Sequence, residues 1–204
     1  MSKSDLSVVI TAPSGTGKTT VIRELMHQMS ELSFSISATT RPKRAAERDG
    51  VDYYFMSEEA FLEGIKNNDF LEWAKVHRNF YGTLKKEIDR INDMGSIPVF
   101  DVDVQGSKSL KGKIGNAVFI LLVPPSLAVL EDRLRKRKSD SELQIELRLE
   151  KAVSEIREYP LFDYIIVNEK LSESVSLIMS IIRAALHRTD RMAFELEKIL
   201  EAGN

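Results

Sequence analysis

Residues 12–19 (APSGTGKT) constrain the fold of this chain most strongly, because they match the pattern of a phosphate-binding loop. An apolar stretch at residues 6–11 predicts a β-strand before the loop, and apolar residues at helical spacing predict a helix after it. Glycines at 15 and 17 allow the backbone N–H groups to turn inward, and the start of the helix adds partial positive charge. Lys18 can reach the outer phosphates of a nucleotide, and the Thr19 hydroxyl can ligate magnesium. We therefore predict a nucleotide-binding site.

Ala12 departs from the pattern GxxxxGK[ST], which begins with glycine. The departure matters only if the backbone at this position needs a positive φ angle. The alternative interpretation is a Gly/Ser-rich turn that binds nothing. The sequence Gly17-Lys18-Thr19 at the start of the helix favours the phosphate site.

Composition places the chain among globular proteins. Its 204 residues suit one α/β domain with insertions, or at most two domains, and the hydrophobic share of 43% supplies a sizeable core. The 29 basic and 31 acidic residues give a net charge of −2, so we expect no nucleic-acid partner. Cysteine is absent, which fits a reducing compartment. The N-terminus does not resemble a signal peptide and no apolar run reaches about 18 residues, so we expect a cytoplasmic protein without a membrane partner.

The apolar patterns predict an α/β fold in which a parallel sheet is flanked by helices. Residues 118–123 form a continuous apolar run, which is typical of a buried parallel strand. Further strands are expected at residues 34–38, 96–104 and 164–167. A helical pattern extends from residue 172 to about residue 200, with a break near Thr189 and Asp190.

Residues 37–90 interrupt the alternation of strands and helices. Here the sequence predicts a β-type run at 51–56, an extended segment at 70–76, a turn at 79–83 and a charged helix at 84–94. Ser57 is expected to cap a short helix that follows it. We interpret this region as a lobe inserted into the sheet.

Four further segments resemble the guanylate kinases in residue type and spacing, from residue 8 to about residue 168. They are Ser37 to Tyr53 with Thr39-Thr40-Arg41 and Arg44, then Phe70-Leu71-Glu72-Trp73-Ala74, Asn79-Phe80-Tyr81-Gly82-Thr83 and Asp101-Val102-Asp103-Val104-Gln105-Gly106. The P-loop is common to many proteins, but this ordered series is specific. The resemblance implies transfer of the γ-phosphoryl group of MgATP to GMP, and also to dGMP. It further implies a P-loop kinase core (residues 1–36, 95–130 and 152–204), a GMP-binding lobe (37–94) and a lid (131–151).

The resemblance also implies roles for residues in the lobe. Glu72 is expected to accept hydrogen bonds from N1–H and the N2 amine of guanine, with the Ser37 and Thr83 hydroxyls near O6 and Asp103 near the same edge. Adenine lacks the N2 amine, so a carboxylate there disfavours it, at a cost of about 1–3 kcal/mol. The clamp on the GMP phosphate is implied to consist of Arg41, Arg44, Tyr53 and Tyr81.

The remaining predicted residues contact ATP or the metal. Lys18, Arg41, Arg137 and Arg148 are the implied catalytic residues, and Arg133, in the charged segment 131–151, is expected to assist them. Thr19 and Asp101 are the expected magnesium ligands, because Asp101 ends a core strand as a Walker B carboxylate does. Lys138 stands where a glycine commonly follows the lid arginine. The expected ATP-binding residues are Pro13, Ser14, Gly15, Thr16, Gly17, Lys18, Thr19, Thr20 and Asn168.

Other interpretations remain open. A single loop glutamate or arginine is usually just solvated, the tyrosines could be core residues, and the charges of 131–151 could be a solvated helical pair. The three histidines, at 27, 77 and 187, lack ligand spacing. As a whole, the chain could instead be a guanylate kinase-like scaffold module that binds protein partners, or a P-loop kinase for another acceptor. The scaffold is disfavoured because the chain retains Gly17-Lys18-Thr19, Arg41, Arg44 and Arg137. Another acceptor is disfavoured by Glu72 together with the Ser37 and Thr83 hydroxyls. The sequence does not distinguish a monomer from a homo-oligomer.

Overall fold

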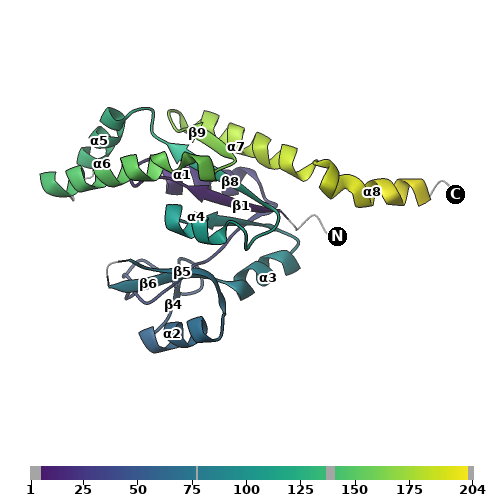
Figure 1. Cartoon of the computed structure of the whole chain (residues 1–204), viewed down its shortest axis with the longest axis horizontal. Helices are drawn as coiled ribbons and strands as arrows, with labels where there is room; N and C mark the ends of the chain where they lie inside the picture. Colours follow the sequence, from purple (N-terminus) through teal and green to yellow (C-terminus); the bar gives the residue numbers. More distant parts are fainter. Residues whose placement is uncertain (1–5, 77, 137–140, 202–204) are drawn as a thin grey trace.

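Two β-sheets organise the chain in a computed structural model that describes residues 6–76, 78–136 and 141–201. The core sheet has five strands in the order β2-β7-β1-β8-β9, and every neighbouring pair is parallel (Figure 1). This confirms the predicted parallel sheet flanked by helices. Its strands are β1 (Ser7–Thr11), β2 (Leu32–Phe34), β7 (Ile97–Asp101), β8 (Ala117–Val123) and β9 (Tyr164–Val167).

Helices cover both faces of the core sheet because its central strands are apolar on both sides. On one face, Val8, Ile10 and Ile120 pack against α1 (Lys18–Gln28) and α7 (Leu171–Leu186). On the other face, Val9 and Phe119 pack with α4 (Val104–Leu110) and the 3₁₀ turn η2 (Tyr159–Leu161). The carboxyl ends of β1 and β7 are thereby held in place beside each other.

The second sheet has the strand order β4-β3-β6-β5 and lies below the core in Figure 1. It pairs β3 with β4 in parallel and β6 with both β3 and β5 in antiparallel. Phe61 of the adjacent helix stacks on Phe70 at a centroid distance of 4.3 Å, which gives this sheet its own apolar core. The elements are β3 (Ala38–Thr39), β4 (Tyr54–Phe55), α2 (Glu58–Lys66), β5 (Phe70–Val76), β6 (Asn79–Leu84) and α3 (Lys85–Asp93).

Three predicted segments of this region were wrong. The strand expected at 34–38 is split, because the chain leaves the core sheet after Phe34 and enters the second sheet at Ala38. The β-type run 51–56 is a strand only at Tyr54–Phe55. The turn expected at 79–83 is the strand β6, where a Cβ on Gly82 would lie 2.8 Å from the Glu72 carbonyl oxygen. Glycine at 82 therefore permits close strand approach rather than a turn.

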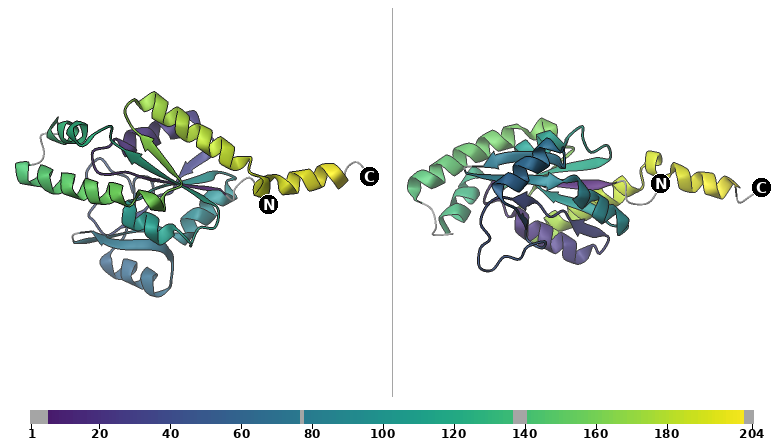
Figure 2. Two further views of the ribbon diagram at one scale, coloured as in Figure 1. Left: turned by 45° about the horizontal axis from the view of Figure 1, so that its top comes forward. Right: turned by 90° about the horizontal axis from the view of Figure 1, so that it is seen from below.

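Three further helices complete the part of the chain that the structure describes. The helices α5 (Leu127–Lys136) and α6 (Glu142–Arg157) pack through Leu130, Leu134 and Ile145, and project from one side of the core (Figure 2). The helix α8 (Thr189–Glu201) follows α7 after the predicted break and points away from the body. No helix in the described ranges is long and apolar enough to cross a bilayer.

Candidate active site

The P-loop joins β1 to α1 as predicted and turns through two left-handed glycines. Gly15 has φ of 93° and Gly17, the N-cap of α1, has φ of 103°. A Cβ at Gly15 would also lie 2.9 Å from the Leu130 side chain of α5, so that side chain would have to shift to admit another residue here. Among the described residues, Asn68 is the one non-glycine with a positive φ, and alanine at position 12 therefore costs no backbone strain.

A pocket of about 330 Å³ opens over this loop. Seven of the nine predicted ATP-binding residues line it, from Pro13 to Thr20 without Thr16, together with Asp103. It also includes Lys151 and Glu155 of α6, which were not predicted as site residues because single charged residues usually face solvent. Burial raises the pKa of Glu155, and the negative charge of Asp103 adds to the effect.

The carboxyl end of β7 meets the P-loop lysine. The Lys18 Nζ atom lies 2.5 Å from Asp101 Oδ1 and also donates a hydrogen bond to the Val102 carbonyl oxygen at 2.9 Å. Asp103 accepts a hydrogen bond from the Gly106 N–H at 2.9 Å and thereby caps α4. Lysine and both carboxylates are thus gathered at the mouth of the phosphate pocket.

Asn168 and Arg133 hold the P-loop from behind. The Asn168 amide is 93% buried; it donates to the Thr16 carbonyl oxygen at 2.7 Å and accepts from the Ser174 hydroxyl. Arg133 donates to the same Thr16 oxygen and to the Asn168 carbonyl oxygen, each at 3.1 Å. The geometry therefore gives both residues contacts with the loop backbone.

On the second sheet, Glu72 of β5 and Thr83 of β6 form a buried pair. Glu72 is 7% exposed, and the Thr83 hydroxyl donates to its Oε1 atom at 2.7 Å. Burial raises the pKa of Glu72, and the charge of Asp103 raises it further. The Oε2 atom lies 3.5 Å from where a Cβ on Gly106 would stand, so glycine leaves space beside this carboxylate.

Arg41, Tyr53 and Tyr81 form a second cluster beside the same sheet. The Arg41 guanidinium lies 5.2 Å from the centre of the Tyr53 ring, and the Tyr53 and Tyr81 rings meet edge to face at 6.2 Å. Glu47 holds Arg41 through two hydrogen bonds of 2.8 and 2.9 Å. These bonds, with one from the Arg44 backbone, lower the pKa of Glu47 to about 2. No local pattern in the sequence predicts that Glu47 is the partner of Arg41.

The remaining predicted site residues lie outside the two clusters just described. Arg44 is exposed and Ser37 is half-buried, with its carbonyl oxygen bonded to the Tyr54 N–H. Arg148 donates to the Ser14 hydroxyl at 3.3 Å, which brings α6 to the P-loop. Arg137 and Lys138 lie outside the described residues.

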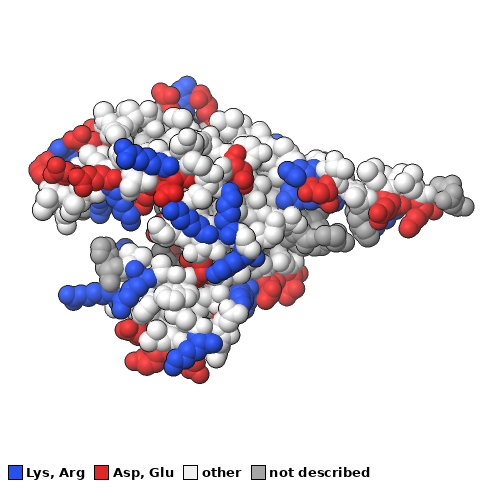
Figure 3. Space-filling view, viewed as in Figure 1, with Lys and Arg blue, Asp and Glu red and all other residues white. Residues whose placement is uncertain are grey.

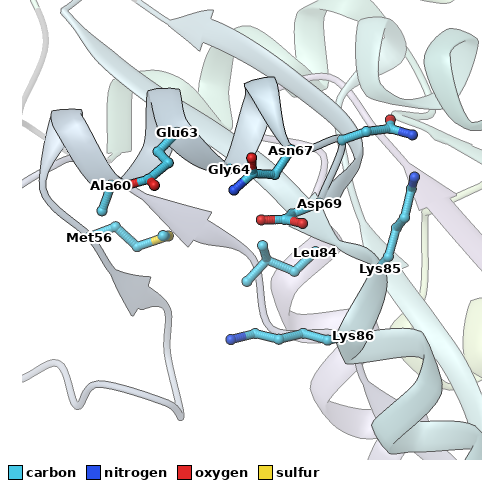
Figure 4. A pocket seen from close by; sticks show the side chains of 10 residues that line it. Met56, Ala60, Glu63, Gly64, Asn67, Asp69, Leu84, Lys85 and Lys86 are labelled. Atoms are coloured by element: carbon cyan, nitrogen blue, oxygen red, sulfur yellow. The ribbon is translucent and has the colours of Figure 1, made fainter.

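The space-filling view shows the molecule hollowed between the part that carries α6 and the part that carries β5 and β6 (Figure 3). Lys and Arg side chains lie on both sides of this hollow. A different pocket, of about 440 Å³, lies between α2 and the start of α3 (Figure 4). Its lining includes none of the predicted site residues.

A P-loop at the carboxyl end of β1, in a parallel sheet flanked by helices, defines a P-loop kinase fold. A family profile described as "Guanylate kinase" matches residues 4–185. The chain belongs to the guanylate kinase family.

Relatives agree with this assignment along nearly the whole chain. A guanylate kinase of Thermotoga maritima is 43% identical over 190 residues, covering 93% of this chain and 92% of the relative. One from Helicobacter pylori is 40% identical, with 96% and 94% covered. The crystal structure of guanylate kinase from Anaplasma phagocytophilum superimposes with a TM-score of 0.72 at 32% identity, covering 91% of this chain and 88% of that one.

Proposed function

We propose that this protein transfers the γ-phosphoryl group of ATP to GMP, giving ADP and GDP. The observation that carries the proposal is the buried Glu72–Thr83 pair on the second sheet, in a chain whose core sheet presents a P-loop lysine. Membership of the guanylate kinase family supports both substrates. Retention of Lys18 disfavours a catalytically inert scaffold module.

Guanine recognition follows from the chemistry of Glu72. Guanine presents N1–H and the N2 amine as adjacent donors, and one carboxylate can accept both. Adenine offers an acceptor at N1 and no amine at position 2, so it would leave a buried carboxylate unpaired, at a cost of about 1–3 kcal/mol. The Thr83 hydroxyl already donates to Oε1, which orients the carboxylate before the base arrives. The same contacts would accept dGMP, because none of them involves the ribose.

Arg41, Tyr53 and Tyr81 would bind the GMP phosphate, and Arg44 would approach it from the exposed loop. Glu47 holds the Arg41 guanidinium over the Tyr53 ring, so the planar donor is ordered in advance. Burial raises the pKa of the Tyr53 phenol, and the negative charge of Asp101, the partner of Lys18, contributes to that shift. The acceptor phosphate would therefore lie between this cluster and Lys18.

The transfer itself requires alignment and charge neutralisation. An oxygen of the GMP phosphate attacks the γ-phosphorus of ATP as the bond to the β-phosphate oxygen breaks, and ADP leaves. The acceptor oxygen is already anionic, so no side chain needs to act as nucleophile. Lys18 stabilises the negative charge that develops on the phosphates, and Arg148 approaches from α6.

Magnesium fits the donors at this site. Among the described residues no three His, Cys, Asp or Glu side chains form a ready-made metal cage. Mg²⁺ is usually held by one or two carboxylates together with substrate phosphates, so this arrangement suits it. Thr19 and Asp101 would hold the ion, which would neutralise phosphate charge. We further assign residues 37–94 to the GMP-binding lobe, 131–151 to a lid and the remainder to the core, in a cytoplasmic enzyme.

The test is a coupled assay of ADP formation with MgATP and each of GMP, AMP, CMP and UMP. The proposal predicts turnover with GMP far above that with the other three. Preference for another monophosphate would overturn the acceptor assignment. Failure of all four, with ATP still bound, would favour the scaffold alternative.

A further inference from the structure

Glu87 is a buried carboxylate that takes no part in the site described above. It lies on α3, a helix rich in charged residues, yet is 1% exposed. Its Oε1 atom accepts from the Ile36 backbone N–H at 3.0 Å and from Arg90 Nη2 at 2.7 Å. Its Oε2 atom accepts from the Tyr54 hydroxyl at 2.9 Å and from Arg90 Nε at 3.0 Å. Each carboxylate oxygen therefore has two donors.

These bonds join the two places where the chain passes between the sheets. The first passage runs from β2 to β3 through Ile36, and the second runs from β6 to β7 through α3. The bond from Ile36 to Glu87 ties one passage to the other. Glu87 thus lies at the connection that sets how the second sheet is held against the core, as the arrangement of α3 in Figure 1 illustrates.

Two of the partners of Glu87, the Ile36 backbone N–H and the Tyr54 hydroxyl, belong to residues that adjoin predicted GMP-binding residues. Ile36 precedes Ser37, and Tyr54 follows Tyr53. Successive side chains of an extended segment point in opposite directions. The Tyr54 side chain reaches back to Glu87, whereas the Tyr53 ring lies beside Arg41 and Tyr81. Glu87 therefore supports the acceptor site from the side opposite to the substrate.

The ionised form of Glu87 is maintained by its donors. Burial acts to raise its pKa, but the bonds from Arg90, Ile36 and Tyr54 outweigh that effect and leave the pKa below its usual value. A buried ion pair is weak support for stability as such, since apolar side chains can often replace it. A more specific role for this carboxylate is to fix the relative positions of the segments that it joins.

We propose that Glu87 is a positioning residue for the acceptor site, which holds Ser37 and Tyr53 in register through Ile36 and Tyr54. This inference rests on the proposed function, because its readout is the binding of GMP. Glu87 itself does not touch the substrate. The effect of losing it should therefore appear in GMP affinity while ATP affinity is preserved.

The test compares Glu87→Gln with Asp89→Asn, which alters an exposed carboxylate on the same helix. Glutamine keeps the shape but turns an amide donor toward groups that are themselves donors. We expect KM for GMP to rise about tenfold, as the loss of one good hydrogen bond would produce. KM for ATP and kcat should stay within about twofold of the wild-type values, because the loss is confined to binding of GMP and leaves the transfer step unchanged. Asp89→Asn should match the wild type in all three.

GMP binding without ATP gives a second readout. Isothermal titration calorimetry can measure that binding in the wild type and in Glu87→Gln, where we expect the same rise of about tenfold in Kd. A merely structural role would lower the folded fraction, which reduces kcat and leaves both KM values unchanged. That result, or an unchanged KM for GMP in folded Glu87→Gln, would overturn the inference.

A milder variant keeps the test decisive if Glu87→Gln does not fold. Tyr54→Phe removes one of the four hydrogen bonds and leaves the charge paired with Arg90. A raised KM for GMP in Tyr54→Phe supports the inference, and an unchanged value rejects it. A wild-type protein that fails to phosphorylate GMP would reject the proposed function instead, so the two failures are distinct.

Discussion

Lys18 and Asp101 are 2.5 Å apart across the junction between the P-loop and the end of β7. The lysine also donates to the Val102 carbonyl oxygen, so its charge is neutralised by protein groups before any nucleotide arrives. Bound phosphates would compete for the lysine, and the Asp101 carboxylate would then be available to a magnesium ion. The ion pair thus keeps two oppositely charged functional groups in place in the ligand-free protein.

Replacing Lys18 with methionine tests the role of the P-loop. We expect kcat to fall by about two to three orders of magnitude, because one donor to the developing charge is lost. Circular dichroism should show an unchanged fold. Lys66→Met, which alters an exposed lysine on α2, is the matched control and should retain wild-type turnover. Near-normal turnover in Lys18→Met would refute the P-loop assignment.

Glu72→Gln should stabilise the folded protein while impairing its function. The folded-state pKa of Glu72 is raised by burial and by Asp103, so its ionised form costs stability above that pKa. The cost vanishes below the unfolded pKa of about 4.3, where both states are protonated. We therefore expect a gain of about 0.5–2 kcal/mol at pH 7.5 in urea unfolding, as is common when a functional strain is removed.

The gain in the free energy of unfolding should shrink as the pH falls toward about 4.5, because the pKa of glutamate in the unfolded state lies near this value. Glu63→Gln, an exposed carboxylate of α2, serves as the control and should change stability little at either pH. If Glu72→Gln were less stable than the wild type at pH 7.5, the carboxylate would be a net stabiliser of the fold, contrary to its raised pKa.

Asn168→Ala probes the support behind the P-loop. The variant leaves the Thr16 carbonyl oxygen and the Ser174 hydroxyl without their amide partner, so stability should fall by about 1–3 kcal/mol. Because the loop is loosened, KM for ATP should rise while KM for GMP stays the same. Steady-state kinetics with each substrate varied in turn would measure both. Asn67→Ala, at an exposed position, is the comparison; equal effects of the two variants would contradict the account.

Closure of the two sheets around both substrates is expected, because water must be excluded from the γ-phosphate. Lys18 begins α1 beside the core sheet, whereas Glu72 lies on β5 of the second sheet, and the hollow between the two parts is visible in Figure 3. Small-angle scattering with a bisubstrate analogue, in which adenosine and guanosine are joined by a phosphate chain, should show a smaller radius of gyration. An unchanged radius with the analogue bound would count against closure.

Local patterns in the sequence predicted the core but not the contacts between distant segments. The P-loop and β8 were predictable because their signals, a glycine-rich turn and an apolar run, are contiguous. Gly82 reads as a turn residue, yet its role is set by the approach of β5, which no local pattern reveals. The split between β2 and β3 was missed for the same reason, since the pattern continues while the chain changes sheets.

Partners of the site residues were the least predictable part. Glu47 and Glu87 look like ordinary charges of a loop and a helix, and only the tertiary structure pairs the first with Arg41 and buries the second. The roles assigned to Glu72, Arg41 and Tyr81 came from family resemblance, and they remain predictions. The structure adds the geometry that makes them testable.

The most direct test of the central claim is the ratio of kcat/KM for GMP to that for AMP, measured in the wild type and in Glu72→Gln. An amide can accept from only one of the two guanine donors and presents a donor of its own, so the ratio should fall by about one to two orders of magnitude. Thr83 can still donate to the amide oxygen, which keeps the site in shape. A large ratio in the wild type that collapses in Glu72→Gln is the result that we predict. A ratio that is the same in both proteins would contradict the assignment of Glu72 to the guanine base.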